Sequence, residues 1–134
     1  MNLLVDTSVW SLALRRRPSA HFRSEESRLV KVLTEAISDG RVAIIGPIRQ
    51  ELLSGIKEEA QFRKVKAALE PFRDELIDTT DYEEAARLYN VCRTQGVECG
   101  PVDILICAVA RRRKWDVLTS DAVMRRCLEI VRSR

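Results

Sequence analysis

Short apolar runs alternate along this chain with longer segments in which apolar residues recur at helical spacing, and this alternation limits the possible folds most. Residues 2–6 (NLLVD), 42–45 (VAII) and 116–119 (DVLT) have the length of buried strands, and each is followed by a segment with helical periodicity. Parallel strands need crossover connections, which are usually helices. The order therefore predicts one α/β domain, with a mostly parallel central sheet covered by helices on both faces.

We expect four to five strands in this sheet. Two weaker candidates join the three above, at residues 75–80 (ELIDTT) and 129–131 (EIV). The expected helices cover residues 7–17, 25–39, 48–72 with a break near Gly55, 82–95, a segment that starts near Pro101, and 120–129. Ser24 is the expected N-cap of the second helix, and Asp81 or Thr80 that of the fourth.

Residues 104–110 (ILICAVA) are apolar around the whole circumference of a helix, which predicts a buried helix. Asp103 stands at the start of this segment, just after Gly100 and Pro101. An aspartate in a first turn is ordinary helix chemistry, because it caps free backbone N–H groups and favours the positive end of the helix dipole. Taken alone, Asp103 is therefore more simply explained as a cap than as a functional group.

Three further acids fall at comparable places on this map. Asp6 directly follows the first strand, Asp121 follows the strand at 116–119 by one residue, and Glu51 lies about one turn into the helix after residues 42–45. Ligands of parallel α/β sheets bind at the carboxyl ends of the strands, so the fold would bring these acids to one edge. Singly, each acid could be a turn residue, a cap or a solvated glutamate.

Carboxylates gathered in one cleft repel each other and lose solvation, and a hard divalent cation resolves both problems. Mg²⁺ prefers oxygen ligands and keeps several waters, so a few carboxylates can hold it while phosphate oxygens complete its shell. Such a site can activate a water and neutralise charge on phosphorus. The pattern of acids therefore indicates phosphodiester hydrolysis.

Several motifs carry a family resemblance. The segments LLVDTSVW, ELLSG, RTQGV, VDILICAVA and VLTSD resemble, in order and over essentially the whole chain, the PIN-domain ribonucleases, most closely the VapC-type toxins of toxin–antitoxin pairs. Cys107 replaces a customary alanine of that family. Residues 122–124 (AVM) stand where the family often has another acid and a phenylalanine.

The resemblance implies a single PIN-like nuclease domain over residues 1–134. It implies that four acids form a catalytic Mg²⁺ site in which Mn²⁺ can substitute: Asp6, Glu51, Asp103 and Asp121. It implies three possible hydroxyl helpers, Thr7, Ser8 and Ser120. The implied activity is an endoribonuclease that cuts RNA with metal-activated water, leaving a 5′-phosphate and a 3′-hydroxyl. As the toxin of a type II pair, it would bind a small VapB-type antitoxin and form a homodimer.

Three basic runs could contact RNA phosphates: residues 15–17, 111–114 and 125–126. The chain carries 23 basic and 20 acidic residues, a net charge of +3 that permits a nucleic-acid partner without requiring one. Arg15, Arg16 and Arg17 follow the helix that leaves Asp6, and they are the better candidates for RNA contact. Residues 111–114 (RRRK) end a helix, where cations are favoured by the dipole, so we interpret them as a solvated helix end.

Two other functions stay open at this stage. One is a catalytically inactive PIN-fold module that binds RNA or protein. The other is a phosphatase with Asp6 as nucleophile, but its haloacid-dehalogenase-like form needs a second aspartate two residues later, where this chain has Ser8.

The four cysteines have six, seven and nineteen residues between them, with no Cys-x-x-Cys pair and one histidine, which argues against a zinc site. Reduced thiols in a cytoplasmic protein are the simplest interpretation. The apolar N-terminal segment lacks an early positive charge and is interrupted by Asp6, which is unlike a signal peptide. No segment has the length of a membrane-spanning helix, so no membrane partner is expected.

Overall fold

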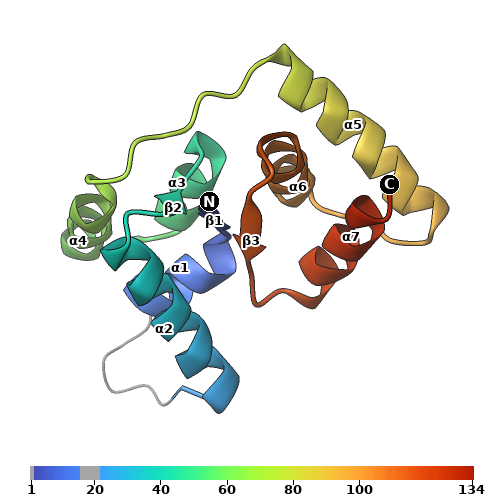
Figure 1. The fold of residues 1–134 in the computed structure, drawn as a ribbon. Coiled ribbons are helices and arrows are strands. Elements are labelled where there is room, and N and C mark those ends of the chain that lie inside the picture. The colour runs from blue at the N-terminus through green and yellow to red at the C-terminus, as the bar shows by residue number, and fades with distance from the viewer. Residues whose placement is uncertain (1, 16–21) are drawn as a thin grey trace.

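The structure is a computed structural model that describes residues 2–15 and 22–134 (Figure 1). Three strands form its parallel sheet: β1 (Leu3–Val5), β2 (Val42–Ala43) and β3 (Asp116–Leu118). Their order is β2-β1-β3, so the first strand lies in the centre. All three side chains of β1 are buried, which requires cover on both faces of the sheet. The predicted α/β class is therefore confirmed.

Seven helices surround this sheet in the described part of the chain. They are α1 (Thr7–Leu14), α2 (Ser24–Ser38), α3 (Gly46–Leu53), α4 (Glu59–Leu69), α5 (Thr79–Thr94), α6 (Pro101–Arg113) and α7 (Ala122–Arg132). In Figure 1, α1 to α4 gather on the side of β2, and α5 to α7 gather on the side of β3. The first four helices of the chain therefore lie on one side of the central strand β1, and the last three lie on the other side.

Two of the expected strands are wrong, so the described sheet has three strands rather than four to five. Next to the segment at 75–80, Asp74 forms an isolated bridge with Ile44, just after β2, and Glu75 N donates to Ile44 O at 2.8 Å. Leu76 is 87% exposed, so this segment buries too little to continue as a strand. Residues 129–131 continue α7 instead, because their apolar side chains extend the buried face of that helix.

The capping of two helices also differs from the prediction. Asp78, rather than Thr80 or Asp81, caps α5: its Oδ1 accepts from Asp81 N at 3.1 Å, and Asp81 Oδ2 accepts from Asp78 N at 3.1 Å. Ser24 is the first residue of α2, and Arg23 occupies the cap position. The break near Gly55 is confirmed, because this glycine has a φ of +86° between α3 and α4.

Helix α6 is the buried helix that the sequence predicted. Its residues 104–110 are all buried. At its C-terminal end Arg111, Arg112 and Lys114 are exposed, as expected of a solvated helix end, but Arg112 and Arg113 also bind a buried acid. Arg112 Nη1 lies 2.6 Å and Arg113 Nη1 2.9 Å from Oδ1 of the fully buried Asp81 in α5. Arg113 is the chief reason why the pKa of Asp81 lies well below its ordinary value. This ion network joins α5 to α6.

All four cysteines are free and buried. The fold brings them together from different elements: the pKa of the Cys127 thiol in α7 is influenced by Cys92 and Cys99, and that of Cys99 by Cys107 in α6. Burial is the main cause that raises the pKa of Cys92 to about 11 and that of Cys127 to about 12. Cys92 and Cys127 therefore remain protonated thiols in the core.

None of the described helices combines the length and the apolar character that crossing a membrane requires.

Candidate active site

Asp6 occupies the junction between β1 and α1, and only 3% of it is exposed. Two hydroxyl groups donate to the same carboxylate oxygen, Oδ2: Ser8 Oγ at 2.8 Å and Thr119 Oγ1 at 2.8 Å. The backbone N–H of Asp6 donates to Leu118 O at 2.9 Å, which continues the pairing of β1 with β3. The orientation of this buried carboxylate is therefore set by the sheet and by two side chains.

Thr119 is a site residue that the sequence analysis missed. The parallel register pairs Val5 with Leu118, so Thr119 lies directly beside Asp6. Its hydroxyl oxygen also accepts from Asp121 N at 3.0 Å. The signal in the sequence was the polar residue that ends DVLT, but the pairing partner of that strand had to be known before the signal could be used.

The three predicted helpers have different surroundings. Ser8 holds Asp6 and also accepts from Ser120 N at 3.0 Å, so Ser120 contributes its backbone to that bond. The buried Thr7 Oγ1 has no hydrogen-bond partner among the described residues. Ser8 is therefore the predicted helper that directly contacts an acid.

Asp121 and Glu51 are both exposed. Asp121 caps α7, because its Oδ1 accepts from Val123 N at 2.8 Å and Met124 N at 3.1 Å. Asp121 therefore is a helix cap, which was one of the explanations open for each acid singly. This position also places its carboxylate just beyond the carboxyl end of β3. Glu51 projects from α3, the helix that follows β2.

Asp103 connects the four acids. It lies in the first turn of α6 and is half-buried. Its pKa is raised from 3.8 to about 6, first by burial and then by the negative charges of Asp6, Asp121 and Glu51. Each of the other three predicted acids therefore acts electrostatically on this one carboxyl group. The fold brings all four into one electrostatic cluster from four separate connections.

The side chains of the four acids are not arranged as a complete set of metal ligands. No group of three or more His, Cys, Asp or Glu side chains within residues 2–15 and 22–134 is arranged to hold a metal ion. The chemistry of the group still fits a hard divalent cation, because it consists of carboxylate oxygens and its charges disfavour the ionised form of Asp103. A bound cation would relieve that repulsion.

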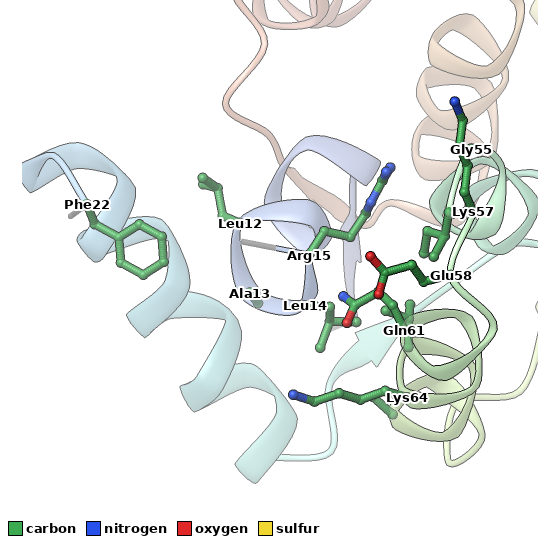
Figure 2. A pocket seen from close by; sticks show the side chains of 13 residues that line it. Leu12, Ala13, Leu14, Arg15, Phe22, Gly55, Lys57, Glu58, Gln61 and Lys64 are labelled. Carbon is green, nitrogen blue, oxygen red and sulfur yellow. The ribbon is translucent and has the colours of Figure 1, made fainter. Parts of the chain in front are cut away.

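A pocket of about 740 Å³ lies near the C-terminal end of α1, away from the acids (Figure 2). In that view Gln61 and Lys64 reach from α4 toward the end of α1, which carries Leu14 and Arg15. Its lining contains none of the four acids, so we do not interpret it as the active site. Of the predicted RNA contacts, Arg15 lines this pocket, and Arg16 and Arg17 lie outside the described residues.

Comparisons with known proteins agree with this fold. No curated protein matches the chain. Among solved structures, the chain is similar to the crystal structure of FitAcB from Neisseria gonorrhoeae, with a TM-score of 0.73 and 23% sequence identity over 95% of this chain and 93% of the other. The model of the PIN domain family matches residues 3–127, which include all four acids. The chain therefore belongs to the PIN domain family.

Proposed function

We propose that this PIN domain is a metal-dependent endoribonuclease whose cation is held by Asp6, Glu51, Asp103 and Asp121. The observation that carries the proposal is that Asp6 and Asp121 follow the carboxyl ends of the paired strands β1 and β3, and that their charges and that of Glu51 reach Asp103 and help to raise its pKa. Acids on four connections have no common structural task, since Asp121 alone caps a helix through its side chain. PIN domains are generally nucleases, which supports the same activity.

In this proposal the acids would bind the cation, and neighbouring hydroxyl groups would hold one of the acids in place. Ser8 and Thr119 both donate to Asp6 Oδ2, so they orient this carboxylate toward the cation. Asp103, in the first turn of α6, would be a second ligand. Mg²⁺ or Mn²⁺, when bound, supplies an activated water and neutralises charge on the phosphate. Ser8 uses its hydroxyl on Asp6, so it does not replace the second aspartate of an aspartate-nucleophile phosphatase.

The purified protein is expected to cut RNA with Mg²⁺ or Mn²⁺ and to stop in excess EDTA. The reason is that the cluster offers hard oxygen ligands, which suit a divalent cation that activates water. Total RNA is the substrate, and the ends of the products are the second readout. Attack by water leaves a 5′-phosphate, whereas a contaminating metal-independent ribonuclease leaves a cyclic phosphate. Undiminished cleavage in EDTA with 5′-phosphate ends would exclude this mechanism, and no cleavage with either metal would favour an inactive binding module.

The toxin role is a finer proposal that rests on the resemblance of LLVDTSVW, VDILICAVA and VLTSD to VapC-type toxins. Under this proposal the protein is a homodimer that cuts RNA and binds a small VapB-type antitoxin as its partner.

Expression of the protein without its partner is then expected to arrest bacterial growth, and co-expression of a small protein encoded beside it should restore growth. The matched control is Asp103→Asn at the same expression level, which keeps the fold and lacks the proposed metal ligand. If both proteins are equally harmless although total RNA is cleaved in vitro, the toxin role is wrong and the nuclease activity stands.

A further inference from the structure

Arg125 lies in α7, four residues after Asp121. One nitrogen of its guanidinium group, Nη2, donates to Thr119 O at 3.2 Å. Thr119 is also the residue whose hydroxyl donates to Asp6 Oδ2 at 2.8 Å. The guanidinium group of Arg125 is thus hydrogen-bonded to Thr119, the residue that helps to orient the buried Asp6.

The same guanidinium nitrogen also donates to Glu25 Oε1, at 2.7 Å, in the first turn of α2. Both side chains are largely in solvent, with 43% of Arg125 and 54% of Glu25 exposed. The hydrogen bond and charge of Arg125 are the largest causes that lower the pKa of Glu25, so the carboxylate stays ionised. Exposed pairs of this kind add little to stability. By contrast, Arg112 and Arg113 are held by the fully buried Asp81.

An RNA strand that approaches four carboxylates meets electrostatic repulsion, and a cation at the rim offsets it. Arginine suits this task because its planar donors bind a phosphate through two parallel hydrogen bonds. An exposed carboxylate that holds the same donors can be displaced by a phosphate at little cost.

We propose that Arg125 binds a backbone phosphate of the RNA beside the acids, and that Glu25 holds the guanidinium group in place until RNA displaces it. This inference rests on the proposed ribonuclease function. It adds a substrate-binding residue that neither the acid pattern nor the predicted Arg15, Arg16 and Arg17 contacts include.

The first test compares Arg125→Gln with Arg126→Gln in a binding assay. Arg126 is exposed on the same helix, so its loss removes the same charge without touching Thr119 or Glu25. The probe is a short fluorescein-labelled single-stranded RNA of mixed sequence, measured by anisotropy in EDTA so that it is not cut. Arg125→Gln should weaken binding by on the order of tenfold and lower the salt slope by roughly 0.7, the contribution of one phosphate contact. Arg126→Gln should bind within about twofold of the parent, because its charge is screened.

Glu25→Gln tests the second half of the proposal and does not depend on how well an Arg125 variant folds. It removes the competing carboxylate, so RNA should bind more tightly than to the parent. Arg125→Lys keeps the charge without the paired donors, and it should bind RNA between the parent and Arg125→Gln.

Each outcome separates this inference from the proposed function. If the parent neither binds the RNA nor cuts total RNA with Mg²⁺, both are wrong. If the parent binds RNA but Arg125→Gln and Arg126→Gln weaken it equally, the effect is one of bulk charge and only the assignment of Arg125 is wrong. Unchanged or weaker binding by Glu25→Gln overturns the role of Glu25 as a competitor.

Discussion

Replacing Asp103 with Asn is expected to lower RNA cleavage at least about a hundredfold, on the order of 3 kcal/mol of lost transition-state stabilisation. Asn caps a helix about as well as Asp, so a residue that only caps α6 could be replaced with little loss. The substitution removes the charge and one hard oxygen ligand. Cleavage of total RNA with Mg²⁺ is the measurement.

The same variant separates the metal-site and capping explanations through stability. The pKa of Asp103 is raised from 3.8 to about 6 in the folded protein, so folding favours its protonated form. This contribution is fully present below about pH 4 and is lost as the pH rises through about 6. Without metal at pH 8, Asp103→Asn should therefore melt at or above the melting temperature of the parent, and its free energy of unfolding should be higher by up to about 3 kcal/mol. The difference should disappear near pH 4.

Added Mg²⁺ should then raise the melting temperature of the parent more than that of the variant, because a ligand stabilises a fold in proportion to its binding. Asp116→Asn is the matched control, since Asp116 is an exposed acid of β3 outside the charge cluster. Its cleavage and its Mg²⁺-induced shift should equal those of the parent. If Asp103→Asn also matches the parent in both, Asp103 is only a first-turn acid of α6 and not a metal ligand.

Replacing Asp81 with Ala is expected to cost about 3–5 kcal/mol of the free energy of unfolding. Asp81 is fully buried, and it accepts hydrogen bonds from Arg112 Nη1 at 2.6 Å, Arg113 Nη1 at 2.9 Å and Arg113 Nη2 at 3.1 Å. Its removal leaves two guanidinium groups without their buried partner and also breaks the capping box with Asp78. Urea unfolding at pH 7 measures the loss.

Glu84→Gln is the control for this prediction, because Glu84 pairs with the neighbouring Arg111 at 2.9 Å in a more exposed position. It should cost less than about 1 kcal/mol. Cleavage per folded molecule should be nearly unchanged in Asp81→Ala, since Arg112 lies about 14 Å from Asp103 along α6. If the two variants cost the same, the buried network does not hold α5 to α6.

The pattern of the sequence was sufficient for the parts of the fold that depend on local periodicity. The alternation of short apolar runs with helical segments predicted the α/β class, and the unbroken apolar run at 104–110 predicted the buried helix α6. The same alternation placed Asp6 and Asp121 at the ends of strands that lie side by side. These features follow from which side chains must leave water, and this can be read along one segment at a time.

Partners that meet across different elements required the tertiary structure. Thr119 could be assigned to Asp6 only after the register paired Val5 with Leu118. Asp81 was indistinguishable from an exposed helix cap until α6 packed on α5 and brought two arginines to it. Cysteines with no motif spacing meet in the core for the same reason, because α5, α6 and α7 converge.

The sequence by itself therefore determined which apolar segments are buried, which segments form helices and which acids stand at the ends of strands. The tertiary structure decided which charges and hydroxyls meet, and it withheld two expected strands: the segment at 75–80 buries too little, and residues 129–131 complete the buried face of α7. The physical reason is that burial depends on each residue and its near neighbours in the chain. A hydrogen bond or ion pair between elements depends on register and packing angle, which no single segment encodes.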